Sequence, residues 1–404
     1  MALMPVEEAL ARLLASVPAI MPAETVTLAL SHGRILAEDV SALRTQPPFP
    51  ASAMDGYAVR AADLAPGVTL RVIGEAAAGC RFSGVLSAGE AVRIFTGAPV
   101  PDGADTILIQ ENADGVGSDT ITARQSESEG RFIRKAGLDF RAGDRLLLAA
   151  DHMTPGRVAL AAAMGHGTLP VRRKPRVAIL ATGDELVAPG NLAGPDQIMA
   201  SNSFALAGIV AQAGGDALDL GIARDDHADL ARAIGEAKAQ SADALVTLGG
   251  ASVGDHDLVQ AALLKAGMTP GFWKIAMRPG KPLMQGMLGD MVVLGLPGNP
   301  VSSIVCGHVF VVPLVRAMLG LAPSAMQNLT AARLGRDLPE NDERQDYLRA
   351  TLAMTQDGLM ATPFPKQDSS MLATLARADA LIVRPPHARA AKAGETCQVI
   401  KLFS

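Results

Sequence analysis

The spacing of apolar and polar positions changes near residue 174, and the part of the chain that follows alternates between two patterns. Short continuous apolar runs predict buried strands, and stretches that are apolar at every third or fourth position predict helices. The predicted strands are 177–181, 217–223, 244–248 and 291–296, and the predicted helices are 203–214, 227–240, 257–266 and 301–319. This alternation predicts a largely parallel sheet with helices on both faces and a ligand site at the carboxyl ends of its strands.

On either side of this central part the pattern is different. Between residues 55 and 139, short apolar runs such as 70–73 alternate with Gly, Pro and Asp turns, which is typical of a mostly β module. Helical spacing is found at 6–16 and again after Thr154, a residue suited to cap a helix. The tail, 326–404, returns to short runs separated by turns and predicts a small β-barrel or sandwich.

Length, charge and cysteine content limit the class of protein. A chain of 404 residues is too long for one ordinary core, so we expect roughly two to four domains. The net charge of −5 argues against a general nucleic-acid surface, which normally carries a basic excess. The three cysteines are far apart and odd in number, so they indicate neither a disulfide framework nor a Cys-x-x-Cys metal site, and a reducing cytoplasm fits best.

The sequence does not predict a secretory or membrane-spanning segment. The first residues lack the basic and continuous apolar regions of a secretory signal. The window 301–320 is the most membrane-like, but His308, Pro313 and Arg316 interrupt it and it directly follows a strand-and-turn pattern. We therefore expect a buried helix there.

The most informative chemistry lies between residues 243 and 300. One apolar run ends in Gly-Gly-Ala-Ser-Val-Gly (249–254), another ends in Leu-Pro-Gly-Asn-Pro (296–300), and the cations Lys274, Arg278 and Lys281 lie between them. Glycine lets backbone N–H groups approach an anion closely, and a helix N-terminus after such a loop adds a positive dipole. Carboxylates occur in the same loops, and Mg²⁺ usually binds through one or two carboxylates plus substrate phosphates. These loops therefore predict a site for a phosphorylated substrate with a divalent cation.

Each of these motifs alone is equally consistent with a structural role. Leu-Pro-Gly-Asn-Pro reads as a tight strand-to-helix turn, and the Gly-Gly loop lacks the Gly-Lys-Ser/Thr of a P-loop. The segment 182–185, Thr-Gly-Asp-Glu, is also suited to cap a short helix, and 52–57 to form a turn with a buried aromatic side chain. The seven histidines show no metal-ligand spacing, so we do not expect a zinc site.

Six motifs that are weak singly become specific when they are taken together. They are Ser-Ala-Met-Asp-Gly-Tyr-Ala (52–58), Arg-Ile-Phe-Thr-Gly-Ala-Pro-Val-Pro-Asp-Gly-Ala-Asp (93–105), Ala-Thr-Gly-Asp-Glu-Leu-Val (181–187), Gly-Gly-Ala-Ser-Val-Gly (249–254), Pro-Gly-Lys-Pro-Leu (279–283) and Leu-Pro-Gly-Asn-Pro-Val-Ser (296–302). In this order they resemble the molybdopterin molybdenumtransferase family, which includes bacterial MoeA and the E domain of gephyrin. The resemblance covers essentially the whole chain.

The resemblance implies a reaction and its reactants. Molybdate would be inserted into adenylylated molybdopterin with the help of Mg²⁺, releasing AMP and giving molybdenum cofactor. The residues fit this chemistry because the donor carries a pyrophosphate and molybdate is a dianion. At roughly 4 Å and an effective dielectric near 20, two like unit charges repel by about 4 kcal/mol. Cations must offset this repulsion, and Lys274, Arg278 and Lys281 are suited to it.

The resemblance also implies site residues. The expected catalytic residues are Asp55, Thr96, Asp139, Glu185, Lys274 and Arg278. The expected substrate-binding residues are Gly249, Gly250, Ser252, Asp225, Asp257, Lys281, Pro297, Asn299, Arg349 and Ser369. The expected magnesium ligands are Glu185, Asp55 and Asp257.

The architecture implied by the resemblance is a multidomain α/β plus β chain. It would have an elongated N-terminal domain (1–44 and 140–173), an inserted mostly β domain (45–139), a central three-layer α/β/α domain of MogA-like, molybdopterin-binding type (174–325) and a small C-terminal β-barrel (326–404). We expect a cytoplasmic homodimer in which the β module of one subunit faces the α/β domain of the other. Expected partners are a molybdopterin adenylyltransferase as donor and downstream molybdoenzymes or chaperones, with no nucleic acid and no membrane.

The sequence departs from the family pattern at two positions. Arg278 stands where we expect lysine, and it offers a planar fork in place of a compact ammonium. Ala200 replaces an acidic residue that is common there.

A molybdopterin adenylyltransferase is one alternative function, but it would need only the central domain. A gephyrin-like scaffold without catalysis is another, and it would need a peptide-binding groove in the tail.

Overall fold

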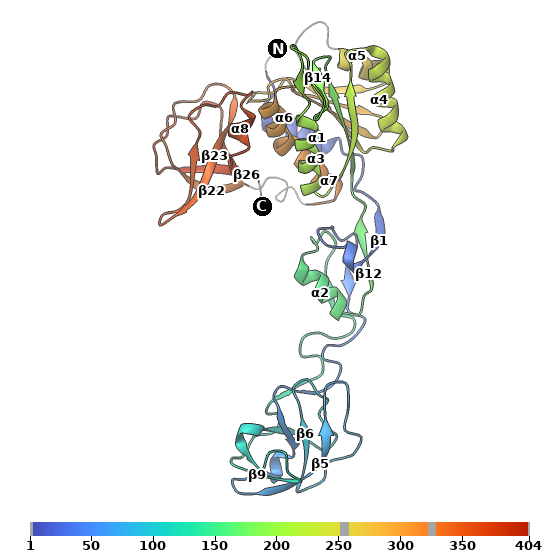
Figure 1. Cartoon of the computed structure of the whole chain (residues 1–404), viewed down its shortest axis with the longest axis vertical. Coiled ribbons are helices and arrows are strands. Elements are labelled where there is room, and N and C mark those ends of the chain that lie inside the picture. The colour runs from blue at the N-terminus through green and yellow to red at the C-terminus, as the bar shows by residue number, and fades with distance from the viewer. Residues whose placement is uncertain (1–2, 251–257, 322–328, 403–404) are drawn as a thin grey trace. The chain divides into compact units, whose positions relative to one another are not determined.

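The computed structural model describes residues 3–250, 258–321 and 329–402. Two compact units make up the chain. Figure 1 shows the whole chain, coloured from the N-terminus to the C-terminus. One unit combines Met1–Glu24 with Arg172–Ser404, and the other is Thr25–Val171. The boundaries of the four expected domains stay a prediction at this finer level.

A six-stranded sheet of order β16-β13-β17-β21-β20-β18 forms the centre of the first unit. The strands are β13 (Arg176–Thr182), β16 (Asp216–Ala223), β17 (Ala244–Leu248), β18 (Thr269–Trp273), β20 (Met284–Leu288) and β21 (Met291–Leu296). The first four in spatial order are parallel. Strands β16 and β17 lie on opposite sides of β13. The chain therefore runs from β13 to β16 on one side, and the connection after β16 leads past β13 to β17 on the other side. In sheets of this kind a ligand binds where the strand order reverses in this way.

The sheet also contains an antiparallel hairpin that the apolar pattern did not predict. β20 and β21 pair antiparallel, with Leu288 opposite Met291, and β18 pairs antiparallel with β20. The turn between β20 and β21 is Gly289-Asp290, and Gly289 has a φ of 64°. A two-residue Gly-Asp turn between apolar runs is a strong hairpin signal, so the sequence contained the information.

Helices cover both faces of this sheet, which confirms the expected three layers (Figure 1). The bounds are α1 (Val6–Ala15), α3 (Asn202–Gln212), α4 (His227–Ala239), α5 (Leu258–Lys265), α6 (Pro300–Cys306), the π-helical turn η4 (Gly307–Val311) and α7 (Val312–Met318). Helices α4 and α5 lie on one face, and α3, α6 and α7 lie on the other. Asp226 caps α4, because its carboxylate accepts hydrogen bonds from two N–H groups of the first turn.

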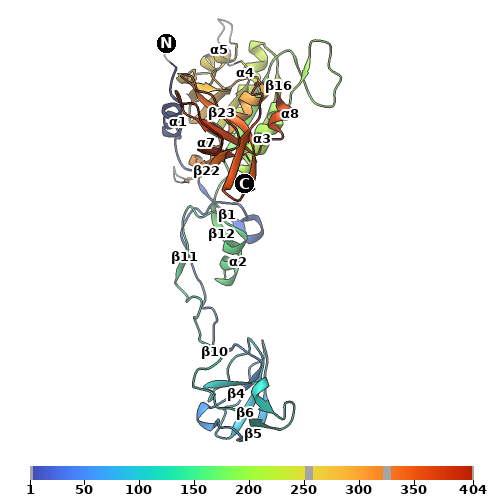
Figure 2. The ribbon, with the colours of Figure 1, turned by 90° about the vertical axis from the view of Figure 1, so that its left-hand side faces the viewer.

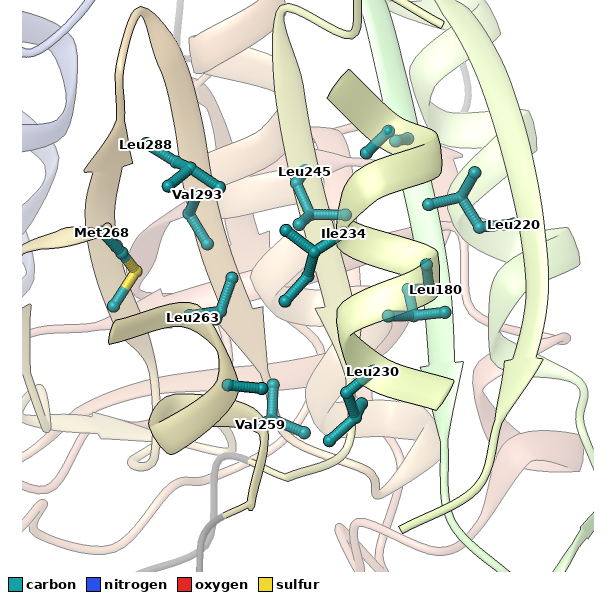
Figure 3. Packing of buried hydrophobic residues seen from close by; sticks show 14 of the residues in the cluster. Leu180, Leu220, Leu230, Ile234, Leu245, Val259, Leu263, Met268, Leu288 and Val293 are labelled. Atoms are coloured by element: carbon teal, nitrogen blue, oxygen red, sulfur yellow. The ribbon is translucent and has the colours of Figure 1, made fainter. Parts of the chain in front are cut away.

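Aliphatic side chains of α4, α5 and the sheet form a continuous core, which Figure 3 shows in close-up. Ile234 of α4 lies against Leu180 and Leu245, while Leu263 of α5 lies near Val293. All five are buried. Each fully buried side chain of this kind contributes about 1.5–3 kcal/mol relative to an exposed one, so this layer holds the helices on the strands that carry the site loops.

Among the described residues, one continuous helical segment, Pro300–Met318, is long and apolar enough to cross a membrane. Within the unit, 72% of its most apolar window is buried. The segment packs against α3 and β21. This agrees with the expectation of a core helix.

The tail forms a closed five-stranded barrel, as expected for this part of the chain. The strands are β22 (Leu329–Leu334), β23 (Gln345–Thr355), β24 (Gly358–Pro363), β25 (Ala380–Arg384) and β26 (Thr396–Lys401), with the short helix α8 (Leu372–Leu375) before β25. Their order is β23-β24-β22-β26-β25, and β25 pairs again with β23 to close the barrel. Figure 2 shows β22 and β23 from a second direction. A further two-residue strand from the central domain, β19 (Met277–Arg278), pairs parallel with the start of β23.

The second unit is mostly β, as its turn-rich pattern predicted. Its main sheet has the order β7-β4-β6-β5-β9-β8, built from β4 (Gly56–Val59), β5 (Thr69–Ala76), β6 (Glu90–Ile94), β7 (Thr106–Ile109), β8 (Ala113–Asp114) and β9 (Thr120–Ala123). Shorter pairs are β1 (Ala23–Thr27) with β12 (Thr168–Arg172), β2 (Val40–Ser41) with β11 (Arg145–Leu147), and β3 (Ala51–Ser52) with β10 (Ile133–Arg134). Helix α2 (Pro155–Ala163) begins after Thr154, whose hydroxyl accepts a hydrogen bond from the Arg157 N–H as expected.

Candidate active site

A cavity of about 690 Å³ opens at the carboxyl ends of β13, β17 and β21. It lies where the strand order reverses, as the topology predicts. The predicted site residues that line it are Glu185, Asp225, Gly249, Gly250, Pro297 and Asn299. The chain therefore brings together residues from four separate loops of the central domain.

The floor of the cavity is a set of backbone contacts between strand ends. The Gly249 N–H donates to the Leu296 carbonyl at 3.1 Å, and the Gly183 N–H donates to the Ala223 carbonyl at 3.2 Å. Gly249 has a φ of 99°, and a Cβ there would lie 2.7 Å from the Thr182 carbonyl oxygen. Glycine is thus required both by the backbone conformation and by the close approach of β13 and β17.

The carboxylates of Glu185 and Asp225 line the β13 and β16 side of the cavity, and Asp184 is a close neighbour of Asp225. Burial raises the pKa of Asp225, and the neighbouring charges of Asp184 and Glu185 raise it further. The Asp225 N–H donates to the Asp184 carboxylate at 3.2 Å, whereas the Glu185 carboxylate makes no hydrogen bond or ion pair with a described residue. This concentration of negative charge is suited to a hard divalent cation, which oxygen ligands bind.

The Thr-Gly-Asp-Glu segment does not cap a helix. Gly183 has a φ of 145°, and a Cβ there would lie 2.3 Å from the Glu185 carboxylate. The chain then enters strand β14 (Leu186–Val187), which pairs with β15 (Ile198–Met199). The helix-capping interpretation of residues 182–185 is therefore wrong, because the segment instead turns Glu185 toward the cavity.

Two helix starts supply hydrogen-bond donors on the opposite side of the cavity. Ser201, Asn202 and Ser203 at the start of α3 line it together with Asn299 and Pro300 at the start of α6. The N-terminal ends of helices favour anions. The Asn202 side-chain amide also donates to the Gly298 carbonyl at 2.7 Å, which joins the two helix starts. Sequence analysis missed the residues of α3, although a Ser-Asn-Ser run before an apolar helix is a recognisable signal.

The cationic segment 274–281 lies next to the cavity in sequence, but its side chains have different environments. Pro282 lines the cavity, while Lys274 and Lys281 do not. Within the described part of the chain their ammonium groups make no ion pair. Arg278, in contrast, contacts Asp342 and Asp346 of the barrel domain. Arg278 is thus paired with carboxylates, whereas Lys274 and Lys281 are not paired with a described carboxylate.

The barrel contributes the other two predicted residues. Arg349 is fully buried, its Nη1 donates to the Met371 carbonyl at 3.2 Å, and its Nη2 has no hydrogen-bond partner among the described residues. The Ser369 carbonyl accepts a 3.1 Å hydrogen bond from the Val301 N–H at the start of α6. The segment that carries Ser369 therefore reaches the edge of the cavity.

The remaining predicted residues belong to the second unit or lie outside the described residues. The Thr96 N–H and hydroxyl both donate to Asp55 Oδ1 at 2.7 Å, which lowers the pKa of Asp55. Tyr57 beside it is buried, whereas Asp55 is exposed. Asp139 is also exposed. Ser252 and Asp257 fall outside the described residues.

The described residues contain no group of three or more His, Cys, Asp or Glu side chains placed to hold a metal ion. Glu185 and Asp225 alone supply two carboxylates at the cavity. A divalent cation would need further oxygen ligands, and substrate phosphates commonly supply them. Ala200, the departure from the family pattern, lies in the cavity wall and adds no ligand.

Comparisons with known proteins agree along the whole chain. Family models match residues 4–165 (MoeA N-terminal region, domain I and II), 178–317 (probable molybdopterin binding domain) and 331–402 (MoeA C-terminal region, domain IV). A molybdopterin molybdenumtransferase of Haemophilus influenzae is 33% identical over 97% of both chains. One of Bacillus subtilis is 35% identical over 93% of this chain and 89% of its own. The crystal structure of the molybdopterin biosynthesis MoeA protein from Pyrococcus horikosii superposes over 100% of both chains, with a TM-score of 0.85 and 32% identity.

The fold is that of a multidomain α/β enzyme, with a cavity at the strand ends of its central domain. The chain belongs to the MoeA family of molybdopterin molybdenumtransferases, and is a transferase of molybdenum cofactor biosynthesis. The match extends over nearly the full length, which separates the chain from a stand-alone adenylyltransferase.

Gly249→Ala should destabilise the chain by more than the roughly 1–3 kcal/mol expected for a strained backbone conformation alone, because its Cβ also meets the Thr182 carbonyl. The matched control is Gly267→Ala, where φ is 96° and nothing lies within 4 Å of the added Cβ. Denaturant unfolding measures both losses. Equal losses in the two variants would contradict the close approach of β13 and β17.

Proposed function

We propose that this chain inserts molybdate into adenylylated molybdopterin and releases AMP and molybdenum cofactor, in a reaction that requires Mg²⁺. The observation that carries the proposal is the division of charge in the cavity. Carboxylates occupy one side, and the starts of α3 and α6 occupy the other. A pyrophosphate that binds at the helix starts can share a divalent cation with the carboxylates.

The proposed roles follow from this division. Glu185 and Asp225 would hold Mg²⁺ together with the substrate phosphates, and Asp257 stays a predicted ligand. Gly249, Gly250, Pro297 and Asn299 would shape the binding site for the nucleotide and the pterin. Lys274 and Lys281 would supply positive charge for molybdate and phosphate, because neither ammonium is paired with a described carboxylate.

The residues present fit a magnesium ion. The raised pKa of Asp225, caused by burial and by two nearby carboxylates, indicates negative charge that no described cation balances. When bound there, Mg²⁺ would polarise phosphoryl oxygens and stabilise the departing AMP. The side chains of Glu185 and Asp225 would orient the ion, and the glycine loop would leave room for the phosphates.

We also propose that the enzyme is a cytoplasmic homodimer with shared sites. Asp55 belongs to the unit Thr25–Val171, and Glu185 belongs to the other unit. Thr96 already holds Asp55 Oδ1 through two hydrogen bonds, so the carboxylate is oriented before any ligand binds. Asp55, Thr96 and Asp139 of one subunit would complete the site of the other. A molybdopterin adenylyltransferase would supply the donor, and molybdoenzymes or their chaperones would receive the product.

The first test measures AMP release from adenylylated molybdopterin with Mg²⁺ and molybdate. Release should require molybdate and should fall at least about a hundredfold in Glu185→Ala and Asp55→Ala, because each change removes a preorganised charged group at the reacting centre. Both side chains are exposed, so the fold should persist, as circular dichroism checks. Wild-type rates of AMP release in both variants would contradict the roles proposed for Glu185 and Asp55.

The second test concerns the shared site. Inactive Asp55→Ala and Glu185→Ala chains, mixed under conditions of subunit exchange, should form heterodimers that contain one intact site, so part of the activity returns. The same measurement on each variant alone gives the baseline. Demonstrated exchange with no recovery would argue that each site is built within one chain.

The third test is the pH dependence of Mg²⁺ binding, followed by calorimetry. Protons and Mg²⁺ compete for the ionised carboxylate, so affinity should decline as pH falls toward the raised pKa of Asp225, starting above the ordinary value of 3.8. In the absence of metal, Asp225 of the folded chain stays protonated at pH values at which the unfolded chain has already lost this proton. Protonated Asp225 therefore contributes to the free energy of unfolding at low pH, and this contribution is lost as pH rises through the raised pKa. Asp225→Asn should weaken this pH dependence, whereas the control Asp114→Asn at an exposed ion pair should keep it. A profile unchanged in Asp225→Asn would exclude Asp225 as a ligand.

A further inference from the structure

Arg278 is engaged by side chains that follow it by more than 60 residues. Its Nη1 donates to the Asp342 carboxylate at 2.8 Å, and its Nη2 donates to the Asn341 side-chain oxygen at 3.2 Å and to the Asp346 carboxylate. The backbone supports this arrangement, because β19 pairs with β23 and places Arg278 opposite Asp346. We call Arg278, Asp342 and Asp346 the Arg278 clasp.

The clasp engages both Nη atoms of Arg278, although 45% of this side chain stays exposed. The side chain of Asp346 is only 7% exposed, and a buried carboxylate requires a partner charge. Asp342 carries a second cation, Arg344, at 2.8 Å, so the group contains two carboxylates and two guanidinium groups. A molybdate that bound to the Nη atoms of Arg278 would compete with carboxylates that are already paired. Lys274 and Lys281 face no such competition within the described residues.

Strand β23 connects the clasp to the edge of the cavity. Arg349 lies three residues beyond Asp346 on this strand, and its N–H and Nε both donate to the Gln367 side-chain oxygen, at 3.0 and 3.2 Å. Its Nη1 holds the Met371 carbonyl. Between these two attachment points, the Ser369 carbonyl accepts the hydrogen bond from the Val301 N–H, next to Asn299 and Pro300 of the cavity wall.

We infer that Arg278 is a positioning residue. It fastens β23 to the segment 274–281 and so holds residues 367–371 of the barrel against the start of α6, while the two lysines serve the anion. This role explains why a forked side chain stands at this position, since one ammonium cannot bind two carboxylates in the geometry of a guanidinium. The activity test of this inference rests on the proposed function, whereas its structural test rests on the hydrogen bonds of Arg278 alone.

The activity test compares Arg278→Met, Asp346→Asn and the double variant by AMP release, with molybdate titrated. A positioning role predicts that each single change lowers kcat about tenfold and leaves the molybdate KM within about twofold. It also predicts that the kcat of the double variant is no lower than that of the less active single variant. A direct anion role predicts opposite signs, because Asp346→Asn would release Arg278 and lower the molybdate KM. That result would overturn the inference.

A second measurement does not depend on activity. Hydrogen exchange at the Val301 amide and across 366–371 should become faster in Arg278→Met and in Asp346→Asn, and should be restored in part by Arg278→Lys, which keeps one contact. Lys392→Met removes an exposed ion pair to Asp337 inside the barrel and should change neither exchange nor rate. Unchanged protection in the clasp variants would refute the positioning role. Wild-type protein that releases no AMP would refute the proposed function and leave the exchange test intact.

Discussion

The close approach of β13 and β17 is the constraint on which the cavity depends. These two strands lie at the point where the strand order reverses, and the cavity opens at their carboxyl ends. A Cβ at Gly249 would press on the Thr182 carbonyl, so the loop is held by backbone geometry and not by a side chain. Glu185 and Gly250 follow these strand ends directly. A small shift between the strands would therefore move the carboxylates and the glycine loop together.

Charge is arranged locally in a chain that is acidic overall. Burial raises the pKa of Asp225, and the like charges of Asp184 and Glu185 raise it further. The starts of α3 and α6 offer the opposite polarity across the cavity, without a side-chain cation. A phosphorylated ligand with a divalent cation satisfies both sides at once, whereas either component alone satisfies one. This interdependence accounts for carboxylates and helix starts sharing one site.

The sequence predicted the parts of the fold that depend on local pattern. The strands at 177–181 and 244–248, the cap at Thr154 and the barrel-like tail follow from apolar spacing and turn chemistry, and the structure confirms them. The glycine and carboxylate loops could be placed at strand ends for the same reason. Assigning them to one reaction needed the family resemblance. Each motif alone had a structural explanation, and for Thr-Gly-Asp-Glu the capping explanation was wrong.

Contacts between segments that lie far apart in the sequence could not be predicted from local pattern. Spacing along the chain gives no reason to pair Arg278 with Asp342 or Asp346, which lie 64 and 68 residues later. From the sequence, Arg278 was one of three cations beside glycine turns, and anion binding was the natural expectation. The structure distinguishes it from Lys274 and Lys281 by its partners. A residue's charge indicates what it is able to bind, but the charges already in contact with it decide what it binds.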